Sequence, residues 1–116
     1  MGDISRGDRR ALSIYKEYGK PLIVCENGIA DSKDRHRAWF IVSHLHNLLK
    51  ALKEDGLNVI GYLHWSLIDN LEWASGFSKR FGLIYVDMNT KKRHPRPSAY
   101  VYRDIVKNNN DTRVSF

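Results

Sequence analysis

The spacing of hydrophobic and polar positions along the chain predicts three helices. Residues 36–54 carry the longest apolar stripe, with hydrophobic side chains three and four positions apart and polar side chains opposite them, as in an amphipathic helix. A similar pattern over residues 5–18 predicts a helix that ends at Gly19, because glycine readily adopts the left-handed conformation that closes a helix. The last helix is predicted over residues 98–107, with Ser98 as its N-terminal cap.

Two short segments between these helices are apolar without alternation. Residues 22–25 and 58–65 are hydrophobic at successive positions, which favours strands that are buried on both faces of a parallel sheet. The segments lie ~35 residues apart with a helix between them, which is the size of one βαβ unit. A long polar and aromatic stretch follows, in which residues 82–87 are predicted to form a hairpin through Asn89 and Thr90.

This order of elements predicts an α/β fold of which the chain supplies only a part. Two parallel strands do not form a stable sheet, because each strand needs neighbours and both faces need cover. A (β/α)8 barrel takes ~250 residues. The chain has 116 residues, so it holds about two of the eight βα units. Residues 108–116 are predicted to be a frayed tail.

Composition narrows the class of protein further. Hydrophobic residues make up 42% of the chain, which is enough for a packed core and excludes disorder of its bulk. A single cysteine excludes a disulfide framework and a cysteine-rich zinc module. No apolar run approaches the ~20 residues of a membrane span. The first residues show no secretion signal, so we expect a cytoplasmic protein without a membrane partner.

The positive charge is concentrated in one part of the chain. Residues 76–116 hold nine basic and three acidic side chains, which accounts for the whole net charge of +6. Such a segment is either a solvated basic loop or the surface for an anionic partner. An anion or nucleic-acid binder would use Lys79, Arg80, Lys91, Lys92, Arg93, His94 and Arg96. The run lacks the interleaved aromatic residues of single-strand binders, so we expect no nucleic-acid partner.

Polar side chains that suit a sugar site follow both predicted strands. Glu26 comes directly after the first strand, and Trp65 ends the second. In barrel enzymes, the carboxyl ends of the strands carry the chemistry. Asp69, Glu72 and Trp73 follow within a few positions. An indole stacks on the C–H face of a sugar ring, and carboxylates accept hydrogen bonds from its hydroxyl groups.

At these residues the sequence resembles glycoside hydrolase family 1, the retaining β-glucosidases and β-galactosidases, and in particular its archaeal branch. The resemblance covers roughly residues 15–107. It rests on four runs: Cys25-Glu26-Asn27-Gly28, the stretch from Tyr62 to Trp73, Arg80-Phe81-Gly82-Leu83 and Arg96-Pro97-Ser98-Ala99. It implies that residues 1–107 form the C-terminal quarter to third of a (β/α)8 barrel.

The resemblance also implies a role for each site residue. Glu26 would be the nucleophile that forms a glycosyl-enzyme with a terminal β-linked glucosyl or galactosyl residue. Trp65 would be the platform beneath the sugar, and Glu72 would accept hydrogen bonds from the 4- and 6-hydroxyl groups. Trp73 would donate to the 3-hydroxyl, and Phe81 would wall the pocket near the 6-position, where a pure packing role is the alternative. We expect no cofactor and no metal.

The acid/base of the family lies in an Asn-Glu-Pro motif, which this sequence lacks. The isolated chain is therefore expected to be inactive unless a complementary N-terminal barrel fragment supplies the acid. Two alternatives stay open beside the C-terminal segment of a retaining β-glycosidase. One is a non-catalytic remnant or split-subunit partner, and the other is the anion or nucleic-acid binder described above.

Cys25, His64 and Lys79 lie at or near the motifs and raise alternatives to the roles given above. Cys25 stands where the family usually has threonine, and it is predicted to be a small buried thiol. A Cys25–His64 nucleophile pair would need an accessible thiol of low pKa, which a buried strand position disfavours. Lys79 matches a lysine of members that select 6-phosphosugars, but a carboxylate at Glu72 would repel a phosphate.

Overall fold

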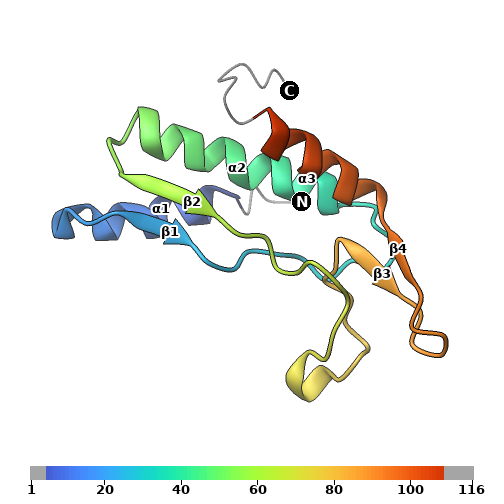
Figure 1. The fold of residues 1–116 in the computed structure, drawn as a ribbon. Coiled ribbons are helices and arrows are strands. Elements are labelled where there is room, and N and C mark those ends of the chain that lie inside the picture. Colours follow the sequence, from blue (N-terminus) through green and yellow to red (C-terminus); the bar gives the residue numbers. More distant parts are fainter. Residues whose placement is uncertain (1–4, 109–116) are drawn as a thin grey trace. The chain divides into compact units, whose positions relative to one another are not determined.

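The computed structural model describes residues 5–108, which form two compact units (Figure 1). Unit 1 comprises residues 5–28 and 39–64, and unit 2 comprises residues 29–38 and 65–108. The predicted tail over residues 108–116 lies outside the described residues except for its first position, Asn108.

The predicted helices are present with slightly different ends. The first is α1 (Ser5–Ile14), and a 3-10 helix η1 (Tyr15–Tyr18) follows it directly, so the last predicted turn is wound more tightly than an α-helix. Gly19 closes it with a φ of 59°, in the left-handed region that glycine adopts without strain. The longest helix is α2 (Arg37–Lys53). No helix within residues 5–108 is long and apolar enough to cross a membrane.

Unit 1 contains the predicted parallel strand pair. Strand β1 (Leu22–Val24) pairs with β2 (Val59–Tyr62) in parallel, and the chain between them includes α2, as in a βαβ unit (Figure 1). Both strands are shorter than their apolar segments.

The prediction that these strands are buried on both faces is wrong for this chain. Ile23 is 49% exposed and Ile60 is 66% exposed, although both lie in the centre of a strand. Among the described residues, β1 and β2 pair only with each other. Burial on both faces needs further strands and a second cover, which these residues do not provide. Unpaired strand edges and solvent-exposed apolar faces are expected of a partial barrel.

Unit 2 contains the predicted hairpin and the last helix. Strands β3 (Ile84–Val86) and β4 (Arg93–Pro95) pair antiparallel, which confirms the hairpin. A short 3-10 helix η2 (Trp73–Ser75) lies in the long loop before them. Helix α3 (Pro97–Lys107) ends the described chain.

The predicted cap of the last helix is wrong. Arg96 occupies the N-cap position and Pro97 the first helical position, where its fixed φ suits a helix start. Ser98 therefore lies inside the first turn, where it is fully buried. Its backbone N–H and its hydroxyl both donate to the carboxylate of Asp34, at 2.8 and 2.6 Å.

Candidate active site

Glu26 lies two residues beyond the end of β1 with an exposed side chain. Within residues 5–108, no side chain or backbone group hydrogen bonds to its carboxylate. The carboxylate is therefore open to a substrate, and the contacts of this chain do not fix its direction.

Cys25 is exposed, so the prediction of a buried thiol is wrong. Strand β1 ends at Val24, and Cys25 thus lies beyond the paired part of the sheet. Its sulfur lies 3.9 Å from the carbonyl oxygen of Ile23, a weak contact at most. Exposure removes one objection to the Cys25–His64 alternative, but the contact that the structure gives the thiol is to the carbonyl oxygen of Ile23 and not to an imidazole.

Asn27, which the sequence motif did not single out for a role, is the most constrained residue next to Glu26. The Tyr62 hydroxyl donates to its Oδ1 at 2.8 Å, and its Nδ2 lies 3.3 Å from Nδ1 of His44. His44 is buried, and its ring packs on Phe40 with the ring centres 4.0 Å apart. His44 and Asn27 are 17 residues apart in the sequence, so the sequence alone does not show that the two side chains meet.

Unit 2 brings together two of the predicted sugar-binding residues. The indole Nε1 of Trp65 donates to Oε1 of Glu72 at 3.0 Å, and both side chains are half-buried. Because Oε1 is engaged by the indole, the second carboxylate oxygen, Oε2, remains for a ligand. The pair presents an aromatic face and a carboxylate in one place.

Trp73 lies at the start of η2 and is 90% exposed. Its φ of +46° is in the left-handed region, which is uncommon for a bulky residue. Three backbone hydrogen bonds close the turn: from Glu72 N–H to the Gly76 carbonyl at 2.8 Å, from Ser75 N–H to the Glu72 carbonyl at 2.9 Å, and from Gly76 N–H to the Trp73 carbonyl at 3.0 Å. The chain thus orders the backbone of Trp73 and leaves its indole unpacked.

Phe81 is half-buried, and its carbonyl oxygen accepts the N–H of Ser66 at 3.1 Å. The next residue, Gly82, has no room for a side chain, since a Cβ there would lie 2.3 Å from the backbone nitrogen of Asp69. The segment that carries Phe81 is therefore pressed against the segment that begins with Trp65.

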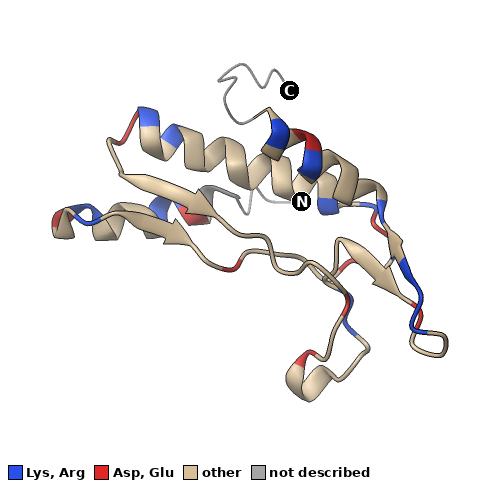
Figure 2. Cartoon of the chain, viewed as in Figure 1, with Lys and Arg blue, Asp and Glu red and all other residues tan. Residues whose placement is uncertain are grey.

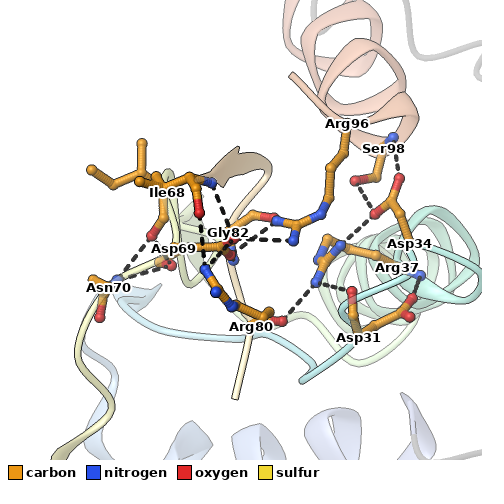
Figure 3. A network of polar contacts seen from close by, with 12 residues as sticks. Asp31, Asp34, Arg37, Ile68, Asp69, Asn70, Arg80, Gly82, Arg96 and Ser98 are labelled. Atoms are coloured by element: carbon orange, nitrogen blue, oxygen red, sulfur yellow. Dashed lines mark hydrogen bonds and ion pairs between the residues drawn. The ribbon is translucent and has the colours of Figure 1, made fainter. Parts of the chain in front are cut away.

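Asp69 is the anchor of unit 2 (Figure 3). Its fully buried carboxylate accepts two hydrogen bonds from Arg96, at 2.9 and 3.0 Å, and one from Arg80 at 3.3 Å. The backbone N–H groups of Gly82 and Val86 add two more. Burial alone would raise the pKa of Asp69, but the hydrogen bonds from Arg96 and from the two backbone groups hold the pKa below its ordinary value.

The grouping of Asp69 with the sugar-binding carboxylates is therefore wrong. Its oxygens are saturated by donors from within the chain, so none is left for a hydroxyl group of a ligand. The physical reason is the position of Arg96, 27 residues further along the chain, which delivers a planar pair of donors to a buried carboxylate.

A second polar cluster holds residues 29–38 within unit 2 (Figure 3). The buried Arg37 pairs with Asp34 and donates to the carbonyl oxygens of Asp31 and Arg80, at 2.7 and 2.9 Å. Because Asp34 also accepts from Ser98, the start of α3 is joined to this cluster. The segment before α2 and the loop that carries Phe81 thus share one hydrogen-bond network.

The basic run is only partly available to a ligand. Arg80 and Arg96 bind Asp69, whereas the turn and strand after β3 expose Lys91, Lys92 and Arg93 (Figure 2). The anion-binding alternative therefore loses two of its seven side chains. Within residues 5–108, no group of three or more His, Cys, Asp or Glu side chains is arranged to hold a metal ion.

Comparison with known proteins identifies similar chains. The Glycosyl hydrolase family 1 model matches residues 4–111. A β-galactosidase of Sulfolobus acidocaldarius is 55% identical over 98 residues, which cover 84% of this chain and 20% of that protein. Beta-glucosidase 44 of Arabidopsis thaliana is 44% identical over 115 residues, covering 90% of this chain and 22% of that protein.

Solved structures of β-glycosidases are also similar to this chain. The β-glycosidase from Thermosphaera aggregans matches with a TM-score of 0.85 and 50% identity, over 90% of this chain and 22% of that one. A family 1 β-glucosidase from Thermotoga maritima matches with a TM-score of 0.82 and 37% identity. The chain spans about a fifth of the length of the curated relatives it matches.

Proposed function

Since the chain belongs to glycosyl hydrolase family 1 and is a partial segment of a (β/α)8 barrel, we propose that it is the C-terminal segment of a retaining β-glycosidase. Residues 1–107 would form the barrel part. The substrate would carry a terminal β-linked glucosyl or galactosyl residue, in keeping with the names of the relatives.

Glu26 is the proposed nucleophile. Retaining hydrolysis needs one carboxylate that attacks the anomeric carbon and one acid that protonates the leaving oxygen. The exposed carboxylate of Glu26 suits the first role, because no donor from residues 5–108 occupies its lone pairs. No Asn-Glu-Pro motif occurs in the sequence, so the acid would come from another polypeptide segment.

The Trp65–Glu72 hydrogen bond is the observation that carries this proposal. It holds an indole and a carboxylate in one arrangement, and sugar recognition uses those two groups together. Oε2 of Glu72 would accept from the sugar hydroxyl groups. The exposed indole of Trp73 would donate to a third hydroxyl, and Phe81 would close the pocket beside the 6-position.

The remaining strands of the barrel, whichever polypeptide supplies them, are part of the proposal. Ile23 and Ile60 lie exposed on a sheet of two strands, and further strands would cover them. We use the term assembled barrel for this chain combined with a companion that supplies the remaining strands and the acid. The isolated chain would be inactive, because it lacks the acid and the neighbours that hold Glu26 in place.

Replacing Glu72 by serine tests the sugar-binding assignment. Hydrogen bonds to a charged group contribute ~1.5–3 kcal/mol, so kcat/KM of the assembled barrel for an aryl β-glucoside should fall about tenfold to a hundredfold in Glu72→Ser. Activity on the corresponding 6-phosphoglucoside should fall less or rise, because the carboxylate that repels phosphate is gone and the exposed Lys79 remains.

The control is Glu17→Ser, which removes an exposed carboxylate from η1 and should leave both values unchanged. If the ratio of the two kcat/KM values in Glu72→Ser equals that of the parent, Glu72 does not contact the sugar near its 6-position.

A further inference from the structure

The direction of the Glu26 side chain depends on its backbone neighbours. The carboxylate has no partner within residues 5–108, and Cys25, which precedes it, makes only a weak sulfur contact. Strand β1 has already ended at Val24. The residue that follows Glu26 is therefore the first one in this segment that a strong side-chain hydrogen bond holds.

Asn27 is held from two different elements of unit 1. The Tyr62 hydroxyl, at the end of β2, donates to its Oδ1 at 2.8 Å, and His44, in the middle of α2, faces its Nδ2 at 3.3 Å. β1 and β2 lie side by side in Figure 1, and the contact between Asn27 and Tyr62 extends that pairing beyond the last strand residue. The amide oxygen thus accepts from Tyr62, and the amide nitrogen lies within reach of the His44 ring.

The Tyr62 contact is the stronger of the two. Nδ1 of His44 also pairs with the carboxylate of Asp8, and a ring nitrogen carries either a proton or a lone pair. It can donate to Asp8 or accept from Asn27, but it cannot do both. Tyr62 donates its one hydroxyl proton to the amide oxygen of Asn27, and its own oxygen can still accept a hydrogen bond from Nδ1 of His64. His64, whose Nδ1 lies 3.4 Å from the same hydroxyl, lies close enough to Tyr62 to help orient it.

We propose that Asn27, fixed by Tyr62, is the positioning residue that sets the direction of the Glu26 carboxylate. This inference rests on the proposed role of Glu26 as nucleophile. Tyr62 acts through Asn27 and does not touch the substrate. A nucleophile that is held in line with the anomeric carbon reacts faster without binding the sugar more tightly, so positioning changes kcat and leaves KM nearly constant.

The experiment compares Tyr62→Phe, Asn27→Ala and the double variant in the assembled barrel, with an activated aryl β-glucoside as substrate. The number of competent sites is titrated with a slowly released fluorinated glycoside, so that unfolded protein lowers the site count and not kcat per site. Loss of one hydrogen bond should lower kcat per site about fivefold to tenfold in Tyr62→Phe. KM should change by less than about twofold. The double variant should be no slower than Asn27→Ala, because both changes remove the same constraint.

The matched control is Tyr100→Phe, which removes the hydroxyl of an exposed tyrosine on α3 and should leave kcat unchanged. A kcat per site in Tyr62→Phe that equals the parent value, or losses that multiply in the double variant, would overturn the inference.

A second measurement separates this inference from the proposed function. Nitrogen-15 relaxation of the Asn27 side-chain amide is recorded on the 116-residue chain, alone and with its companion. The order parameter should be near that of rigid groups, about 0.85, and should fall below about 0.6 in Tyr62→Phe. A mobile amide in the parent refutes the positioning role whatever the activity. An inactive assembled barrel in which the amide is rigid refutes the proposed function and leaves the Tyr62–Asn27 contact supported.

Discussion

Glu26→Gln should reduce turnover of the assembled barrel by about a thousandfold or more, because an amide cannot form the glycosyl-enzyme. Sugar binding should persist, since glutamine has nearly the size of glutamate and the exposed carboxylate makes no hydrogen bond within the described residues 5–108. The measurements are steady-state hydrolysis of an aryl β-glucoside and calorimetric binding of a sugar that is not hydrolysed. Loss of turnover with retained binding is the expected combination.

Glu17→Gln makes the same chemical change at an exposed position of η1 and should have no effect. A second arm uses Glu26→Ala with added azide. Alanine leaves space where the carboxylate was, so azide can attack the anomeric carbon from that face. The expected product is an α-glycosyl azide. More than a tenth of the parent rate in Glu26→Gln, in a preparation free of parent protein, would refute the assignment.

Asp69→Asn should destabilise unit 2 by about 3–5 kcal/mol, since removal of one partner leaves the buried guanidinium of Arg96 without its counter-charge. Arg80 would lose a partner as well. Hydrogen exchange of the assembled barrel reports the effect at the N–H groups of Leu83 and Ile84. These groups bond to carbonyl oxygens of the segment after Trp65, at 2.9 Å each, and exchange when that segment detaches.

The matched control is Asp104→Asn. Asp104 pairs with Arg103 at 2.9 Å on the surface of α3, where both side chains are more than half exposed, and such pairs contribute ~0–1 kcal/mol. If Asp69→Asn changes the exchange free energy by no more than this control, the carboxylate of Asp69 is not the anchor of unit 2.

Elements with a strong local pattern could be predicted from the sequence. The apolar stripe of α2 and the glycine that closes η1 depend only on neighbouring residues, and both were located within a few positions. The β3–β4 hairpin likewise follows from a local turn. Burial could not be predicted in this way. Ile23 and Cys25 belong to an apolar run, but their exposure depends on which strands lie beside them.

The roles of the site residues likewise depend on contacts between residues that are distant in the sequence. The structure joins Trp65 and Glu72 by a hydrogen bond, but the sequence pattern could not separate Glu72 from Asp69, three residues earlier. One carboxylate has a free oxygen and the other is saturated by an arginine distant in sequence. The available signal is the two arginines: Arg80 and Arg96 belong to the basic run by sequence, and the structure pairs each of them with the carboxylate of Asp69.

Complementation tests the central claim most directly, that residues 1–107 provide the nucleophile and part of the sugar site of a larger (β/α)8 barrel. The chain is mixed with a companion that carries the first six strands and the Asn-Glu-Pro motif, and hydrolysis of an activated aryl β-glucoside is followed with the configuration of the released sugar. We expect no turnover from either piece alone, turnover with retained β-configuration from the mixture, and none from a mixture that contains Glu26→Gln. Glu26-dependent turnover by the chain alone, together with a cooperative thermal transition, would contradict this account, and so would a folded mixture that remains inactive.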